Sequence, residues 1–275
     1  MNEREPARSN RFLDALRQRP LLLDAAMGTR LIARGLVLGH DDPCLWNLDR
    51  PDEVLGVHRL DVEAGADAVL TNTFGANRNM LVHYGREHDL IPINRDAVAL
   101  AREAAGLDRF VIGCIGPMAN QALNDSGEQA AILIDAGVDA LVFETHDVSE
   151  ALRALAAPLG GHSIVRLVSL RGETPPTPLD VQELIHQGAR AIGTNCLLGV
   201  GPTSLWLERL PTLADFPLIV KPSAGLPGEP MEQPEAFAEA VPRWLALGVR
   251  LIGGCCGTTE AHVAALRAAI DRNDP

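Results

Sequence analysis

The sequence predicts an α/β protein that folds as a single-domain (β/α)8 TIM barrel. Eight short apolar or β-branched runs recur along the 275 residues, and a stretch long enough for a helix follows each one. Several runs are apolar throughout, as expected for parallel strands that are covered on both faces. Eight such units in about 250 residues match the size and repeat number of this barrel.

The predicted strands are distributed over nearly the whole chain. In order they are Leu21–Asp24, Ala68–Asn72, Phe110–Cys114, Ala140–Glu144, Ile164–Ser169, Ala191–Cys196, Leu218–Lys221 and Arg250–Gly253. Residues 1–19 are interpreted as a polar N-terminal extension or helix, and residues 20–275 as the barrel domain. We find no interdomain linker within this alternation, which favours one domain.

Amphipathic or alanine-rich segments predict the helices between the strands. The clearest are Pro51–Ala64, Arg95–Ala105, Glu128–Ala136 and Ala261–Ile270. Gly65, Gly137 and Gly248 each lie between the end of a helical segment and the next strand. A helix that ends in this way needs a left-handed residue, so these three glycines are expected at positive φ.

Composition and charge narrow the class of protein. With 47% hydrophobic and 22% charged residues, the chain is globular, which argues against disorder or a coiled coil. The formal net charge of −12 and the absence of a Lys/Arg cluster argue against nucleic acid and anionic membranes as partners. No apolar run is long enough to span a bilayer and no secretory leader is evident, so we expect a cytoplasmic protein.

The chemistry is expected at the carboxyl ends of the strands, where residues far apart in sequence converge in this fold. Polar and sulfur groups stand at these ends in six of the eight units. They are Asp24, Asn72, Thr73, Glu144, Asn195, Cys196, Lys221, Ser223, Cys255 and Cys256. The first candidate site is therefore the barrel mouth.

Three thiols are predicted to meet there, from Cys196 after the sixth strand and from Cys255 and Cys256 after the eighth. Thiolates are soft ligands, and three protein ligands with an open fourth position are typical of a catalytic zinc site. Free cysteines are also often simply small buried apolar residues. The spacing alone leaves both interpretations open, although an adjacent pair between glycines favours a ligand-bearing turn.

The other polar residues also have two interpretations. Asp24 and Glu144 either are solvated loop acids or offer negative charge to a cationic group such as an α-ammonium. Asn72, Thr73 and Asn195 either satisfy loop backbone or contact the substrate. The glycine-bearing loops after the seventh and eighth strands are also compatible with a phosphate site. That alternative gives the two adjacent cysteines no purpose.

Five segments resemble the homocysteine S-methyltransferase family. They are Leu-Leu-Leu-Asp-Ala-Ala-Met-Gly-Thr at 21–29, Ala-Asp-Ala-Val-Leu-Thr-Asn-Thr-Phe-Gly-Ala at 66–76, Phe-Glu-Thr at 143–145, Gly-Thr-Asn-Cys at 193–196 and Gly-Gly-Cys-Cys-Gly-Thr-Thr at 253–259. The second and last look most similar to the homocysteine module of cobalamin-dependent methionine synthase. The resemblance implies a (β/α)8 barrel over nearly the whole chain.

The resemblance also assigns roles. It implies that Cys196, Cys255 and Cys256 bind zinc, whose fourth position takes the substrate thiol. Asp24 and Glu144 match acids that hold the homocysteine ammonium, and backbone N–H groups near Ala25 and Ala26 match those that receive its carboxylate. Asn72, Thr73 and Asn195 are expected beside the substrate. A free thiol is only about 3% ionised at pH 7, whereas zinc coordination deprotonates it.

The function implied is a zinc-dependent S-methyltransferase that forms methionine from homocysteine. The expected donor is either a small onium compound or methylcobalamin on a separate corrinoid protein. One alternative is methyl transfer to another small thiol, and another is a non-catalytic zinc-binding barrel that acts as a subunit.

Several positions depart from the family pattern. Ala25 replaces a usual Gly, Cys114 a usual Asp or Ser, and Ser223 the Asn of the methionine synthase pattern. The loops after Met118 and Ser169, which help to shape the donor side, are expected to be shorter than in relatives.

Overall fold

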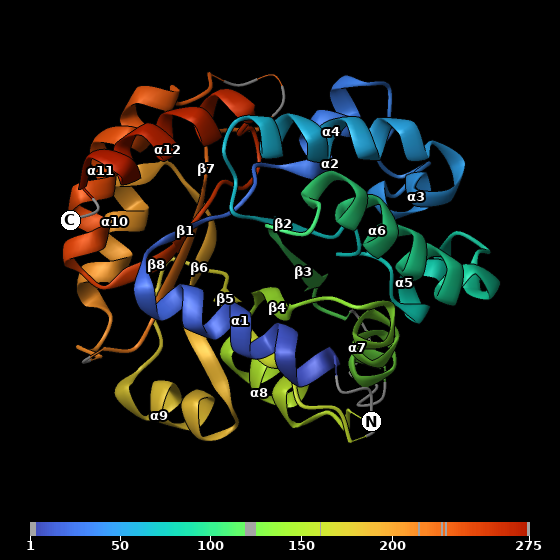
Figure 1. Cartoon of the computed structure of the whole chain (residues 1–275), viewed down its shortest axis with the longest axis horizontal. Helices are drawn as coiled ribbons and strands as arrows, with labels where there is room; N and C mark the ends of the chain where they lie inside the picture. The colour runs from blue at the N-terminus through green and yellow to red at the C-terminus, as the bar shows by residue number, and fades with distance from the viewer. Residues whose placement is uncertain are drawn as a thin grey trace.

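The computed structural model of the chain describes residues 4–118, 125–159, 161–213, 215–226, 228 and 230–273. Eight parallel strands form one sheet in the order β1-β8-β7-β6-β5-β4-β3-β2, and helices surround it (Figure 1). The predicted (β/α)8 barrel is therefore confirmed. Among the described residues, no helix combines the length and the apolar character needed to cross a membrane.

The strands lie close to their predicted positions. They are β1 (Leu21–Leu22), β2 (Ala68–Leu70), β3 (Phe110–Ile115), β4 (Ala140–His146), β5 (Val165–Leu170), β6 (Ala189–Leu198), β7 (Leu218–Ser223) and β8 (Val249–Ile252). β1, β2 and β8 end one or two residues earlier than predicted, whereas β3 to β7 continue one or two residues beyond their predicted ends.

The helices lie outside the barrel or between its strands. They are α1 (Arg4–Gln18), α2 (Met27–Ala33), α3 (Trp46–Asp49), α4 (Pro51–Glu63), α5 (Arg78–His83), α6 (Leu90–Ala105), α7 (Asp125–Ala136), α8 (Val148–Ala156), α9 (Pro178–His186), α10 (Val200–Arg209), α11 (Pro234–Ala246) and α12 (Glu260–Asn273), with short 3₁₀ turns η1 (Pro43–Leu45) and η2 (Glu87–Asp89). α6 begins at Leu90, before the predicted start at Arg95, because Pro92 lies in its first turn, where no N–H donor is needed. Gly65, Gly137 and Gly248 have φ values of 104°, 102° and 91°, as predicted.

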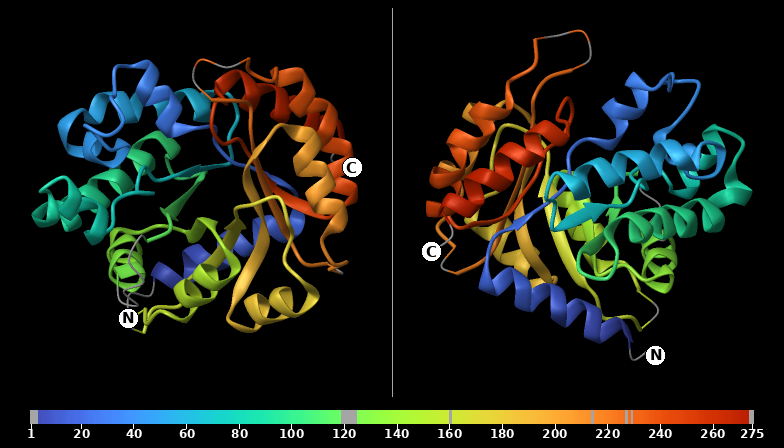
Figure 2. Two further views of the ribbon diagram at one scale, coloured as in Figure 1. Left: turned by 180° about the vertical axis from the view of Figure 1, so that it is seen from behind. Right: turned by 45° about the horizontal axis from the view of Figure 1, so that its top comes forward.

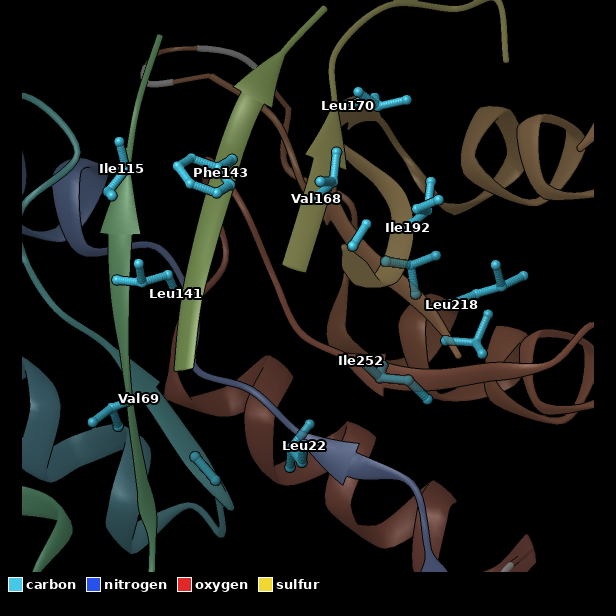
Figure 3. Close-up of a cluster of buried hydrophobic side chains, with 14 of the residues drawn as sticks. Leu22, Val69, Ile115, Leu141, Phe143, Val168, Leu170, Ile192, Leu218 and Ile252 are labelled. Atoms are coloured by element: carbon cyan, nitrogen blue, oxygen red, sulfur yellow. The ribbon is translucent and has the colours of Figure 1, made fainter. Parts of the chain in front are cut away.

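Side chains alternate between two cores along the strands. Leu22, Val69, Leu141, Val168 and Ile252 point outward and pack beneath the helices, as Figure 3 shows. Their neighbours along the strands fill the barrel interior, among them Leu21, Leu23, Ala68, Leu70, Ile112, Val142, Leu167 and Ile219. This period of two fixes which face of each strand looks into the barrel.

Helix α1 packs across one end of the barrel, as the two views of Figure 2 show. Its Phe12 and Leu16 are buried in the interior cluster, and the Phe12 ring stands edge-on to Phe110 at 5.2 Å between centroids. The predicted polar extension thus carries an apolar face. The opposite end, where the strands have their carboxyl ends, stays available for a site.

Closure of the barrel between β1 and β2 depends on few backbone contacts. An isolated bridge joins Leu23 to Ala68. Two carboxylates complete the junction: Asp67 Oδ2 accepts the Leu22 N–H at 2.8 Å, and Asp24 Oδ2 accepts the Leu70 N–H at 2.7 Å. β1 ends early because the Asp24 side chain takes a donor that a ladder carbonyl would otherwise take.

The loops expected to be short are only partly described. Residues 119–124, in the loop after β3, lie outside the described residues. The loop after β5 spans residues 171–177. Their length relative to other proteins stays a prediction.

Candidate functional site

The three predicted cysteines come together at the carboxyl end of the barrel. Cys196 Sγ lies 2.7 Å from Cys255 Sγ and 3.9 Å from Cys256 Sγ. All three sulfur atoms lie within 4.8 Å of one another, a grouping that could hold a metal ion. Hydrogen bonding to Cys196 and burial raise the pKa of Cys255 to about 12, so a cation that binds here must displace thiol protons.

A β-bulge directs Cys196 toward the other two cysteines. The register of β6 against β7 shifts between Asn195 and Leu198, and Cys196 has a φ of 60°. Left-handed backbone at a residue with a Cβ costs about 1–3 kcal/mol and is concentrated at functional sites. The bulge turns the Cys196 side chain out of the strand's normal alternation.

The Cys255–Cys256 turn is fixed to the end of β7. The Cys255 N–H donates to Pro222 O at 2.8 Å, and the Ala224 N–H donates to Cys256 O at 2.8 Å. A Cβ on Gly254 would lie 2.2 Å from Thr258 Oγ1, so only glycine fits before the cysteine pair. The Gly-Gly-Cys-Cys-Gly motif is therefore required by close backbone packing as well as by its sulfur atoms.

A cavity of about 270 Å³ borders the cysteine cluster. Most of the residues that the sequence predicted for the site line it: Asp24, Ala25, Ala26, Asn72, Glu144, Cys196, Cys255 and Cys256. Thr73 and Asn195 are fully buried behind this lining. Thr73 Oγ1 donates to Cys114 O at 2.7 Å, so it positions β3. Direct substrate contact by Thr73 and Asn195 stays a prediction.

Asp24 is a buried acid with one free oxygen. Its Oδ2 accepts the Leu70 N–H, whereas its Oδ1 has no hydrogen-bond partner in the described part of the chain. Burial raises the pKa of Asp24 to about 7, against the opposing charge of Lys221. An unpaired buried acceptor is unfavourable, so this position suits a ligand that brings a hydrogen-bond donor.

Glu144 differs, because the protein itself supplies donors to both of its oxygens. Lys221 Nζ lies 2.5 Å from Oε1, and the Cys114 thiol donates to Oε2 at 3.1 Å. Burial on its own lowers the pKa of Lys221, but the charges of Glu144 and Asp24 outweigh it and raise that pKa. Lys221 and Cys114 line the cavity too. The sequence placed Lys221 among the polar groups at the strand ends but assigned it no role, and Cys114 was noted only as a departure from the family pattern.

The backbone at Ala25 and Ala26 is held by a buried ion pair. Arg30 Nε donates to Ala26 O at 2.7 Å, and Arg30 NH1 donates to Asp61 Oδ1 at 2.9 Å. The Ala26 N–H donates to Thr258 Oγ1 at 3.1 Å. Carboxylate binding at Ala25 and Ala26 stays a prediction, and the Ala26 N–H already has a protein partner.

Asn72 is tied to the loop on one side of the cavity. Its Nδ2 donates to Pro43 O at 2.6 Å and to Asn47 Oδ1 at 3.0 Å. Asn47 Nδ2 returns a hydrogen bond to Asn72 O at 2.8 Å. These contacts fix the segment around Pro43, which also lines the cavity.

Comparison with known sequences agrees with this geometry. The profile of the family described as homocysteine S-methyltransferase matches residues 21–270. The chain belongs to the homocysteine S-methyltransferase family. The matched region contains all eight strands of the barrel and all three clustered cysteines.

Two curated relatives are much longer than this chain. Methionine synthase of Mycobacterium tuberculosis is 34% identical over 94% of this chain and 25% of its own length. Methionine synthase of Mycobacterium leprae is 33% identical over 95% of this chain and 25% of its own length. The chain thus spans about a quarter of these curated relatives.

Solved structures in the family have a similar fold. The metallated form of the homocysteine methyltransferase MmuM from Escherichia coli is 30% identical, with a TM-score of 0.76. The match covers 95% of this chain and 99% of that one. A methyltransferase from Methanosarcina mazei, at 14% identity and a TM-score of 0.62, shares the fold alone.

Proposed function

We propose that this member of the homocysteine S-methyltransferase family transfers a methyl group to the thiol of homocysteine and forms methionine. The observation that carries the proposal is the cluster of Cys196, Cys255 and Cys256 beside a cavity that contains a buried acid with a free oxygen. The relatives named methionine synthase and homocysteine methyltransferase support it.

We infer that zinc is the resident metal. Three sulfur atoms within 4.8 Å of one another suit a soft cation. Three protein ligands leave a fourth position for an incoming thiol. When bound, zinc would lower the pKa of the substrate thiol so that it is a thiolate at neutral pH. The solved relative described as metallated supports a metal in this fold.

The protein's own residues bind and orient the acceptor. Asp24, the buried acid with a free oxygen, is expected to attract its ammonium, and the peptides around Ala25 and Ala26, held by Arg30, are expected to receive its carboxylate. Orientation of this kind makes the in-line attack on a methyl group effectively unimolecular.

The donor is expected to approach past Cys196, which is exposed, whereas Cys255 and Cys256 are partly buried. We propose a small onium compound or methylcobalamin on a separate corrinoid protein as the donor. Assays of methionine formation with S-methylmethionine, betaine and methylcobalamin distinguish the two classes.

Zinc-edge X-ray absorption on the reduced protein, with and without L-homocysteine, tests the proposal. The expected result is a change from three sulfur neighbours to four. Zinc that keeps three sulfur neighbours would instead favour another small thiol or a non-catalytic zinc-binding subunit. Absence of sulfur-bound zinc would overturn the mechanism.

A further inference from the structure

The two acids in the cavity differ in what the protein already gives them. Glu144 has Lys221 on one oxygen and the Cys114 thiol on the other. Asp24 has the Leu70 N–H on Oδ2 and no partner on Oδ1 among the described residues. A ligand with one positive charge therefore meets one acid whose two oxygens already have protein partners and one acid with an unpartnered oxygen.

Lys221 is held in its place from several sides. It is 4% exposed, and the charges of both Glu144 and Asp24 act on it. The next residue, Pro222, accepts the Cys255 N–H, which fixes the end of β7 to the cysteine turn. To withdraw from Glu144, the lysine would leave a buried carboxylate without its ion-pair partner, which is strongly unfavourable.

We propose that Asp24 alone selects an acceptor with an α-ammonium group, and that Lys221 is a specificity-determining residue that keeps Glu144 from this task. The inference rests on the proposed function, because it assumes a thiol acceptor bound at the cysteine cluster. It differs from the role implied by family resemblance, in which both acids hold the ammonium.

The charge balance of the cavity supports this division. Lys221 neutralises Glu144, so a zwitterionic amino-acid thiol brings one ammonium to one unpaired acid. Two unpaired carboxylates beside three metal-bound thiolates would leave excess buried negative charge. Lys221 is in direct contact with Glu144 and acts on Asp24 only through its charge, so Asp24 Oδ1 gains a direct cationic partner only when the acceptor binds.

The test compares two ligands that differ only in the ammonium group. Isothermal titration calorimetry on the zinc-loaded protein measures the dissociation constants of L-homocysteine and of 4-sulfanylbutanoate, which lacks the amino group. We expect the wild type to prefer homocysteine by about tenfold or more, the value of one charge-assisted hydrogen bond.

Three variants show which acid is responsible for the preference for homocysteine. Asp24→Asn keeps an oxygen for the Leu70 N–H and is expected to lose the preference. The double variant Lys221→Met/Glu144→Gln removes the ion pair with side chains of similar length and is expected to keep it. Lys221→Met alone frees Glu144 and should increase the preference. Circular dichroism and thermal unfolding show whether each variant is folded.

The outcomes separate this inference from the proposed function. Loss of the preference in the folded double variant, or its retention in Asp24→Asn, would overturn the assignment to Asp24. Equal affinity of the wild type for both ligands would overturn it too, while thiol binding at the metal would stand. If the zinc-loaded wild type binds neither thiol, the proposed function itself fails, and the inference with it.

Discussion

The side chain of Asn195 in β6 reaches over β5 to Thr145 in β4. Its Nδ2 donates to Thr145 Oγ1 at 2.7 Å, and its Oδ1 accepts the Thr145 N–H at 3.1 Å. Thr145 has a φ of 62° and lies at the register shift between Glu144 and His146. One amide therefore joins the strand of the buried acid to the strand of Cys196.

Replacement of Asn195 by Ala should weaken zinc binding by about 10–100-fold, the usual cost of a lost residue behind a metal ligand. The reason is that the left-handed backbone at Thr145 and Cys196 loses its cross-strand support. Competition with a chromophoric chelator measures the affinity. Asn273→Ala, near the end of α12, is the matched control and should bind zinc as the wild type does. Equal affinity for Asn195→Ala would contradict this role.

Removal of one sulfur from the cluster should abolish tight zinc binding. In Cys256→Ala only Cys196 and Cys255 remain, and a two-thiolate site is incomplete for zinc. Metal analysis after gel filtration is expected to give one zinc per wild-type chain and almost none for the variant. Cys44→Ala, which removes a buried cysteine of another core cluster, should retain its zinc. A variant that still carries full zinc would show that Cys256 is not a ligand.

Disruption of the buried Arg30–Asp61 pair should be costly only when one partner is removed. Arg30→Met leaves Asp61 as an unpaired buried charge and should lower the free energy of unfolding by about 3–5 kcal/mol. The double variant Arg30→Met/Asp61→Leu removes both charges and should recover most of that loss. Urea unfolding at pH 7 measures both. Similar losses in the single and double variants would argue against a charge effect.

His58 should make the folded state sensitive to mild acid. It is completely buried, neither ring nitrogen has a partner within the described structure, and burial lowers its pKa from 6.5 to about 3. Because the folded pKa is depressed, the stabilising contribution is complete above pH 6.5 and is lost as pH falls toward 3. At pH 5 the loss is about 2 kcal/mol.

The comparison with His58→Leu isolates this effect, because Asp24, with its raised pKa, changes stability in the opposite direction over the same range. Urea unfolding of both proteins at pH 7 and pH 5 is expected to show the variant gaining about 2 kcal/mol relative to the wild type on acidification. An unchanged difference between the two proteins would show that His58 takes up no proton on unfolding.

Much of the fold could be predicted from sequence because its signals are local. Apolar runs locate all eight strands, and the glycine after a helix predicts the positive φ of Gly65, Gly137 and Gly248. The length of β1 could not be predicted in this way. It depends on the Asp24 side chain, which accepts a donor from Leu70 in the neighbouring strand.

Site residues could be predicted where their position depends only on the end of the strand that carries them. The positions of Cys196, Cys255 and Cys256 follow from barrel topology and the family motifs. The pairing of Glu144 with Lys221 does not, because 77 residues separate them and only the side-chain directions across the mouth bring them together. The absence of a hydrogen-bond partner for His58 among the described residues likewise depends on tertiary packing, which the sequence does not reveal.

The brief contact between β1 and β2 has a dynamic consequence. Segments with few backbone hydrogen bonds open at the lowest free energy, so local unfolding of this barrel should begin at that seam. Asp24 accepts the Leu70 N–H at the seam and also lines the cavity. A ligand that binds Asp24 should therefore also stabilise the contact between β1 and β2. Slower hydrogen exchange at the Leu70 amide would detect this stabilisation.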